Sequence, residues 1–381
     1  MIGFNKPYFT GKETDYMQDA VKRQKISGNG HYTQLCHQFF QKKYGFEHVL
    51  LTHSCTAALE MAALLINIQP GDEVIIPSYT FVSTANAFIL RGAKVVFVDS
   101  CAENPNLDAS SIAPLINART KAIVVVHYAG IACHMGEILD LVKRHRLFLV
   151  EDAAQAIDSF WEGKPLGSLG HLACFSFHET KNIISGEGGM LVINDPAFTA
   201  RAEILWEKGT NRSAFFRGEV DKYTWVDIGS SFLPSDMIAA FLYAQLENID
   251  DIQQRRRAIW QRYFDQLQGL AEQNLVQLPH IPAYATNNAH MFYLVCQSAS
   301  QRQSLIEYLK AQHIHAIFHY LSLHESPFYS VLHDGRNLPQ TRRYTDCLVR
   351  LPFYYELSEP EQALVCEHIS QFYLKNQVMA S

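Results

Sequence analysis

The sequence has no long apolar run and no leader-like beginning. No stretch of about 18 consecutive apolar residues, the length that a membrane-spanning helix requires, occurs in the 381 residues. Residues 1–7 lack the apolar core of a secretory signal peptide. We therefore expect a protein of the cytoplasm, neither embedded in a membrane nor secreted.

Paired cysteine motifs are also missing. The eight cysteines form no C-x-x-C pair and no cluster with histidines at metal-ligand spacing; they stand at positions 36, 55, 101, 133, 174, 296, 347 and 366. Most lie within apolar runs, where a free thiol behaves as a small buried apolar group. This pattern favours a reducing compartment over a disulfide-linked fold, and it predicts no metal site.

Charge of one sign is not concentrated along the chain. The 32 basic and 38 acidic residues are mixed, and the formal net charge is −6. A short basic run, Arg255–Arg257, is typical of the exposed face of a helix. Because there is no basic block, we expect no nucleic-acid partner.

A dinucleotide-binding fingerprint is absent as well. Ser27–Gly30 contains G-x-G, but it has no third glycine and no preceding strand. A turn between helical segments within residues 12–44 is the better interpretation. This argues against a nicotinamide-dependent dehydrogenase.

What the sequence does contain is a regular alternation of strands and helices. With 48% hydrophobic and 18% charged residues its composition is globular, and its length suggests two domains. We expect strands at 48–52, 73–77, 94–99, 122–126 and 147–150, and helices at 57–68, 83–91 and 135–145. This order predicts a parallel sheet covered on both faces, with binding sites at the carboxyl ends of its strands.

Two of these strand ends carry groups suited to a planar, phosphorylated ligand. Ser54–Thr56 opens a helix, where free backbone N–H groups and a hydroxyl suit a phosphate. An ordinary helix cap is the alternative. Ser78–Phe81 supplies aromatic rings that suit a planar ligand, although an aromatic residue after a strand is more often part of the core.

Two further strand ends supply a carboxylate and a lysine. Glu151–Gln155 follows an apolar strand, and a buried carboxylate requires a partner, either in a ligand or in a structural salt bridge. Ser176–Lys181 lies between two apolar strands beside the glycine-rich segment 186–189. A lysine in a partly desolvated site can form a Schiff base, although a loop lysine beside a tight turn would look similar. A phosphate site, an aromatic ring, a carboxylate and a lysine are together what pyridoxal 5′-phosphate (PLP) requires.

These segments resemble the DegT/StrS group of fold-type I, PLP-dependent sugar aminotransferases. The resemblance runs from about residue 4 to beyond 355, and the matching segments are 54–59, 70–75, 77–81, 151–155, 176–181 and 186–189. It implies an α/β fold whose large PLP-binding domain has a mostly parallel sheet flanked by helices. A homodimer with active sites at its interface is also implied.

The pattern changes around residue 247. A long helix at 249–268 precedes a strand at 290–297 and a helix at 304–312, and a last helix is expected at 359–374. We therefore divide the chain into a large domain, residues 1–247, and a smaller C-terminal α/β domain, residues 248–381.

Carried over position by position, the resemblance implies two catalytic residues. Lys181 forms the Schiff base with the PLP aldehyde, and Asp152 pairs with the ring nitrogen and keeps it protonated. The other implied cofactor contacts are Gln155 and Phe81 at the ring, and Thr56, Ala57 and Ser176 at the phosphate.

The sequence departs from the family's pattern at one cofactor contact. The family's phosphate-binding asparagine comes from the partner subunit, within G-x-N-Y-R; residues 229–233 read G-S-S-F-L, so Ser231 would supply a weaker contact. Family members with histidine in place of the Schiff-base lysine carry out dehydration instead. Lys181 is present, which disfavours that branch.

Two segments are implied to contact the substrate. Residues 319–324 resemble the family's H-Y-x-P-L-H segment near the sugar, with serine in place of proline. Residues 208–227 correspond to a segment that reaches toward the neighbouring subunit's nucleotide sugar. The candidate substrate residues are His319, Tyr320, Arg212, Lys222 and Tyr223. For each of them, a surface or interface contact is the alternative.

The implied reaction moves the amino group of L-glutamate to the C4 keto group of dTDP-4-keto-6-deoxy-D-glucose, giving dTDP-4-amino-4,6-dideoxy-D-galactose. This would serve deoxyamino-sugar and polysaccharide biosynthesis. Alternatives are another nucleotide-linked ketosugar, with a 3-keto group or a gluco product, and a non-catalytic sensor of PLP and sugar nucleotide. Asp152 argues against the sensor, because binding alone needs no carboxylate at the ring nitrogen.

Overall fold

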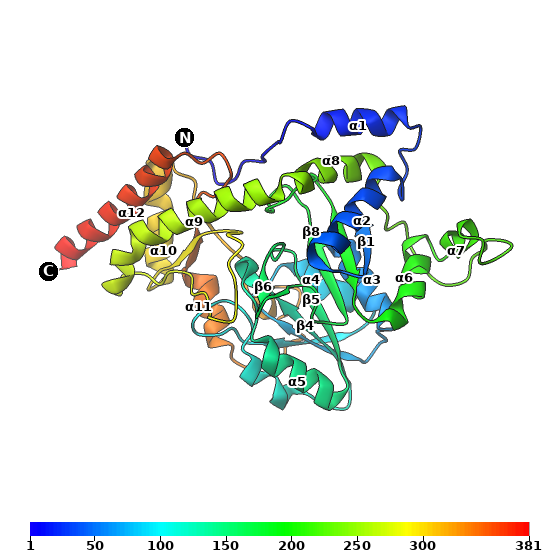
Figure 1. Ribbon diagram of the computed structural model, residues 1–381. Coiled ribbons are helices and arrows are strands. Elements are labelled where there is room, and N and C mark those ends of the chain that lie inside the picture. Colours follow the sequence, from blue (N-terminus) through cyan, green and yellow to red (C-terminus); the bar gives the residue numbers. More distant parts are fainter. Residues whose placement is uncertain (381) are drawn as a thin grey trace.

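A seven-stranded sheet is the frame of the molecule (Figure 1). The computed structural model describes residues 1–380, with side chains described up to Leu374. In spatial order the strands are β1 (His48–Thr52), β9 (Gly189–Ile193), β8 (Leu172–Ser176), β5 (Phe148–Asp152), β4 (Thr120–Val126), β2 (Glu73–Pro77) and β3 (Lys94–Val98). Neighbours from β8 to β3 pair in parallel, whereas β9 is antiparallel to both β8 and β1. The predicted mostly parallel sheet is confirmed.

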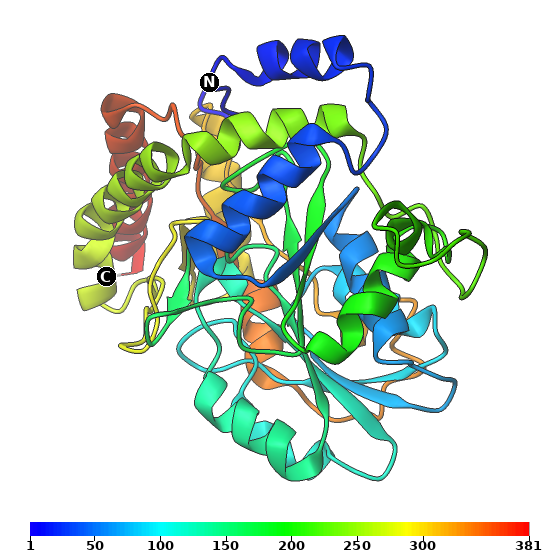
Figure 2. The same cartoon turned by 45° about the vertical axis from the view of Figure 1, so that its right-hand side comes forward.

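Helices cover both faces of this sheet, as Figure 2 shows. One face packs against α3 (Cys55–Leu65), α4 (Val82–Ile89) and α6 (Thr199–Trp206); the other packs against α2 (His31–Tyr44), α5 (Met135–His145) and α8 (Asp236–Glu247). Because side chains alternate along a strand, Leu172 and Cys174 of β8 point to the first group, and Ala173 and Phe175 to the second. Burial on both faces explains why the strands are apolar throughout.

The helix expected at 57–68 is displaced toward the N-terminus and spans Cys55–Leu65. It begins earlier because the Ser54 hydroxyl accepts the backbone N–H of Ala57 at 3.1 Å and so caps the helix. It ends earlier because Asn67 adopts a left-handed conformation with φ 55°. The displacement brings the first turn of α3 to the edge where the strands end.

A second, three-stranded antiparallel sheet follows the long helix α9 (Ile249–Glu272). Its order is β10 (Tyr293–Val295), β12 (Leu348–Arg350), β11 (Ile317–Phe318), and α10 (Ala299–Ala311) and α12 (Glu359–Ala380) pack against it with α9. Ile2 joins this second core and bridges Ile314, so the first residues of the chain lie beside its last third (Figure 1). The division at residue 247 stays a prediction.

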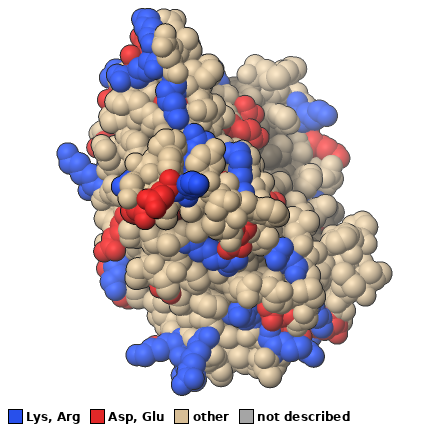
Figure 3. Space-filling view, turned by 90° about the vertical axis from the view of Figure 1, so that its right-hand side faces the viewer, with Lys and Arg blue, Asp and Glu red and all other residues tan. Residues whose placement is uncertain are grey.

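Several short elements were not expected from the sequence. They are the hairpin β6–β7 (Phe160–Trp161 and Lys164–Pro165), α7 (Arg212–Phe216) and α11 (Pro339–Cys347). The helix α1 (Glu13–Lys22), which packs on α8, is one of the helical segments expected within residues 12–44. Acidic and basic side chains lie interspersed over the face that carries α7 (Figure 3). None of the helices among the described residues is long and apolar enough to cross a membrane.

Glu151, the residue before Asp152 on β5, is buried within a polar network. Its carboxylate accepts backbone N–H groups from Gly167, Leu169 and Gly170 at 2.6–2.9 Å. His127 Nε2 donates to it at 3.0 Å, since Nδ1 of the same ring accepts a backbone N–H at 3.2 Å. Burial alone would raise the pKa of Glu151, but the hydrogen bonds from His127 and the backbone hold it below its usual value.

Replacing Glu151 by alanine should destabilise the fold severely. The substitution leaves three backbone N–H groups without an acceptor, so the free energy of unfolding should fall by about 3–5 kcal/mol. Thermal unfolding followed by circular dichroism measures the effect. Glu103→Ala is the matched control because Glu103 is exposed. Equal unfolding temperatures for the two variants would contradict this role of Glu151.

Candidate active site

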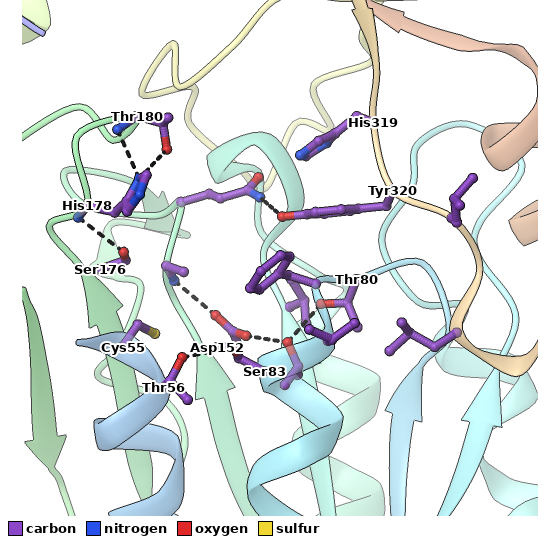
Figure 4. A pocket seen from close by; sticks show the side chains of 18 of the residues that line it. Cys55, Thr56, Thr80, Ser83, Asp152, Ser176, His178, Thr180, His319 and Tyr320 are labelled. Carbon is purple, nitrogen blue, oxygen red and sulfur yellow. Dashed lines mark hydrogen bonds between the residues drawn. The ribbon is translucent and has the colours of Figure 1, made fainter. Parts of the chain in front are cut away.

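A cavity of about 960 Å³ lies at the carboxyl ends of the central strands. Its floor is formed where β4, β5 and β8 end and where α3 and α4 begin, and residues 318–327 and Arg350 close it from the side of the second sheet (Figure 4). Most of the predicted site residues line it: Thr56, Phe81, Asp152, Gln155, Ser176, Lys181, His319 and Tyr320. The structure therefore brings segments from the whole length of the chain to one place.

Lys181 lies in the loop that joins β8 to β9. The loop is held by hydrogen bonds from Lys181 N–H to the His178 carbonyl and from Glu179 N–H to the Gly186 carbonyl, both 2.9 Å. Gly186 has φ 78°, a conformation that favours glycine. Burial lowers the pKa of Lys181 to about 8. No carboxylate of the described residues lies within ion-pair distance of this amine, so a larger share of it is unprotonated near neutral pH than of an exposed lysine.

Asp152 ends β5 and points away from Glu151, because successive side chains alternate across a strand. Its Oδ2 accepts the Thr84 hydroxyl at 2.7 Å, and its Oδ1 accepts the Ala154 N–H at 3.1 Å (Figure 4). Burial raises the pKa of Asp152. Among the described residues it has no ion-pair partner, so the carboxylate is suited to a positively charged N–H group of a ligand.

The first turn of α3 presents backbone amides to the cavity. Ser54 caps the helix, and the amides of Cys55 and Thr56 precede the first intrahelical hydrogen bond, as phosphate binding requires. Ser54, Cys55, Thr56 and Ser176 line the cavity. Ala57 is buried and does not line it, and its amide donates to the Ser54 hydroxyl.

Gly189 allows the start of α3 to approach β9. A Cβ at this position would lie 2.3 Å from the Ser54 carbonyl carbon and 2.5 Å from the Cys55 nitrogen, both backbone atoms. Only glycine permits this contact without a shift of the helix start. The glycine-rich segment 186–189 thus shapes both the lysine loop and the amide cradle.

Gln155, Tyr320 and His319 form one connected layer on the side of the cavity that faces the start of α3 (Figure 4). Gln155 accepts the Ala129 N–H at 2.6 Å and donates to the Tyr320 hydroxyl at 3.0 Å. The rings of His319 and Tyr320 stack at 3.6 Å, and the Tyr128 hydroxyl lies 2.7 Å from His319 Nδ1. Burial lowers the pKa of His319 well below its usual value, so the ring is neutral. Phe81 stands at the rim, with 57% of its surface exposed and its ring 6.3 Å from that of Tyr320.

Besides Ala57, four of the predicted residues do not line this cavity. Arg212, Lys222, Tyr223 and Ser231 belong to the segment 207–231, which contains α7 and projects from the body of the molecule (Figure 1). The segment also carries exposed apolar side chains, such as Trp225 with 78% of its surface exposed.

The lining residues that were not singled out from the sequence include Thr84, His290 and Arg350. Thr84 orients Asp152 and stands one helical turn after Thr80, whose hydroxyl lies 2.9 Å away. His290 is buried and hydrogen-bonds Asn182 at 2.8 Å. Arg350 stands inside an apolar run, and a charge in such a run was the signal that identified Asp152.

The residues present fit PLP. The amides of Cys55 and Thr56 with the hydroxyls of Thr56 and Ser176 suit its phosphate, and the buried, unpaired Asp152 carboxylate suits its ring nitrogen. The amine of Lys181 suits its aldehyde, because the lowered pKa keeps the nitrogen nucleophilic.

Gly189→Ala should weaken PLP binding. The added methyl group displaces the start of α3, and overpacking of this kind costs about 1–3 kcal/mol, equivalent to an affinity lower by about 5–150-fold. Equilibrium dialysis against PLP measures the change. Gly136→Ala is the control, because a Cβ there meets only the Trp161 ring, at 3.9 Å. The same PLP affinity in both variants would refute the proposed cradle.

Lys181 should react as a lysine of lowered pKa. In cofactor-free protein, its acetylation by acetic anhydride should reach half its maximal rate near pH 8, whereas an unperturbed lysine titrates near about 10.4. In Asp152→Asn the midpoint should fall further, since the carboxylate favours the protonated amine. Peptide mass spectrometry of Lys181 across a pH series provides the reading. A midpoint near 10 would contradict desolvation of the amine.

Comparison with known proteins agrees with this site. Residues 7–370 match the DegT/DnrJ/EryC1/StrS aminotransferase family. The chain is 31% identical to a GDP-perosamine synthase of Escherichia coli O157:H7 over 97% of both proteins, and 34% identical to one of Caulobacter vibrioides over 77% of this chain and 76% of that protein.

A solved structure gives the same result. The aminotransferase TlmJ from Streptoalloteichus hindustanus superposes with a TM-score of 0.91 at 28% identity, covering 99% of this chain and 100% of that one. Aminotransferases of this family use PLP and share the fold-type I architecture. The expected family is thus confirmed: the chain belongs to the DegT/DnrJ/EryC1/StrS aminotransferases and is a PLP-dependent sugar aminotransferase.

Proposed function

We propose that the enzyme transfers the amino group of L-glutamate to the C4 keto group of dTDP-4-keto-6-deoxy-D-glucose, giving dTDP-4-amino-4,6-dideoxy-D-galactose. The reaction type is carried by one observation: Lys181 and Asp152 line the same cavity, the amine with a lowered pKa and the carboxylate without an ion-pair partner among the described residues. The choice of sugar is supported by a further resemblance: residues 77–92 and 208–231, which extend beyond the cofactor motifs, are similar to those of dTDP-4-amino-4,6-dideoxygalactose transaminases.

The cavity also suits a sugar nucleotide in size and lining. About 960 Å³ leaves room for a substrate beside PLP. Val82, Leu321 and Pro327 provide apolar surface, which fits the methyl group of a 6-deoxy sugar. Gln155, His319 and Tyr320 provide polar groups for hydroxyls.

Asp152 and Lys181 would have separate roles in the reaction. Bound PLP supplies an aldehyde that can carry an amino group and a ring that accepts negative charge. Asp152 would keep the ring nitrogen protonated. The Lys181 amine is placed to take a proton from the donor's α-carbon and later to deliver one to the sugar's C4, since a pKa of about 8 suits both directions near neutral pH.

A GDP-linked sugar is the second candidate. Two relatives that are at least 31% identical to this chain are named GDP-perosamine synthases. The cofactor-binding residues serve either nucleotide, so the candidates differ only in the outer part of the site. The substrate test therefore has to include both.

A homodimer is part of the proposal. Arg212, Lys222 and Tyr223 lie outside the cavity of their own chain, on a projecting segment with exposed aromatic side chains. In a dimer this segment would reach the partner's cavity and contact its nucleotide sugar. Ser231, at the base of the segment, would then face the partner's PLP phosphate.

The substrate assignment is tested by incubating the PLP-loaded enzyme with L-glutamate and a panel of ketosugars. The panel holds dTDP- and GDP-linked 4-keto-6-deoxy sugars and a dTDP-linked 3-keto sugar, with product configuration read by NMR. We expect the galacto-configured 4-amino product from the dTDP-4-keto sugar, and no turnover in Lys181→Ala. If the enzyme aminates the GDP-linked sugar in preference, the GDP-linked sugar replaces the dTDP-linked sugar as the assigned substrate. Unchanged cofactor absorption with glutamate alone would favour the sensor.

A further inference from the structure

Arg350 lines the cavity from the small sheet. It is the last residue of β12, the central strand, and pairs with Tyr293 of β10 and Ile317 of β11. Its backbone is therefore held on both sides. A charged side chain fixed in this way faces the same space as Lys181.

The guanidinium of Arg350 has no protein acceptor among the described residues. It makes no hydrogen bond and no ion pair to them, and its Nε is buried without a partner. Arg256, a second buried arginine, shows the contrast: it donates to the carbonyls of Ala289 at 3.1 Å and His290 at 2.7 Å. The fold satisfies one buried arginine and leaves the donors of the other available.

The groups around Arg350 orient it without neutralising it. The Phe4 ring lies 4.8 Å from the guanidinium carbon and covers one face, which leaves the N–H edge as the binding surface. Burial lowers the pKa of both His290 and His319, so these neighbouring rings are neutral. A buried guanidinium of this kind is suited to bind an anion that presents two oxygens in one plane.

Three anionic groups would enter this cavity if the proposed function, on which this step rests, is correct. The PLP phosphate has its own site at the start of α3. The diphosphate of a sugar nucleotide is separated from the reacting C4 atom by the sugar ring. The carboxylates of the amino donor lie only a few bonds from the carbon that must reach Lys181. The charge of Arg350 contributes to the lowered pKa of the Lys181 amine, so the two side chains are close enough to interact electrostatically.

We propose that Arg350 binds a carboxylate of the amino donor, an amino acid such as L-glutamate. The guanidinium edge would take the two oxygens in a paired arrangement and hold the donor's carbon toward Lys181. The contact that holds the donor thus comes from the small sheet, and the cofactor contacts come from the large one.

Binding of glutarate, a dicarboxylate without an amino group, tests this without turnover. Isothermal titration of PLP-loaded protein should show glutarate binding about 10–100-fold weaker in Arg350→Met than in the unsubstituted protein. Binding of dTDP and the PLP content should be unchanged. Arg343→Met is the control, because Arg343 donates to the Ala102 carbonyl at 3.1 Å and does not line the cavity.

The alternative anions give different results. Loss of dTDP binding in Arg350→Met, alone or with glutarate, would assign the arginine to the diphosphate and overturn the proposal. Loss of PLP would assign it to the cofactor, and unchanged glutarate binding would overturn the proposal outright. If the methionine variant does not fold, Arg350→Lys keeps the charge but not the paired geometry, and glutarate binding equal to that of the unsubstituted protein would refute the role.

The proposed function fails in a different way. If glutamate is not the donor, the unsubstituted protein itself will neither bind glutarate nor change its cofactor absorption with glutamate. If only the sugar is wrong, glutarate binding and its dependence on Arg350 stay intact. The comparison of variant with unsubstituted protein therefore isolates Arg350.

Discussion

Desolvation of charged groups is the constraint on which the active site depends. Lys181, Asp152 and Arg350 all lie in one cavity, and none has an ion-pair partner among the described residues. Burial lowers the pKa of Lys181, raises that of Asp152 and lowers that of Arg350. The free energy that opposes such burial must be offset by the rest of the fold, and it is recovered when ligands supply the missing opposite charges.

The neighbouring carboxylates of β5 show how the fold divides stability from chemistry. Glu151 is satisfied by His127 and three backbone amides, whereas Asp152 receives only a hydroxyl and one amide. Two adjacent acidic residues on a buried strand are placed on opposite faces, because the side-chain period of a strand is two. One therefore holds the segment 167–170 in place, and the other remains available to the cofactor.

Much of this site could be predicted from the sequence, because a charged residue in an apolar strand requires an explanation. Asp152 was identified in this way, and Lys181 because it lies between two apolar strands beside a glycine-rich segment; the order of strands correctly placed both at one edge. Arg350 carried the same signal, but its strand is short and belongs to the second sheet, whose contact with the cavity depends on tertiary packing. Thr84 carried no such signal, because a threonine in a helix does not stand out in the sequence until its hydrogen bond to a carboxylate is known.

The helix start and the projecting segment show two further limits. Ser54 and Thr56 both suited a cap, and only the observed hydrogen bond showed that Ser54 caps α3 and that the Ala57 amide is occupied. Arg212, Lys222 and Tyr223 lie on a projecting segment and do not line the cavity of their own chain. No property of a single sequence places such residues in space if, as in the proposed homodimer, their surroundings belong to another molecule.

The contact between Phe4 and Arg350 joins residues almost 350 positions apart. Phe353 N–H also donates to the Phe4 carbonyl at 3.1 Å, and Ile2 bridges Ile314, so the beginning of the chain is held by its last third. During synthesis these first residues cannot form their native contacts until nearly the whole polypeptide has left the ribosome. The wall of the cavity that contains Arg350 is therefore completed last, and a chain shortened before residue 350 would have the sheet that carries Lys181 but an open side where the donor is expected to bind.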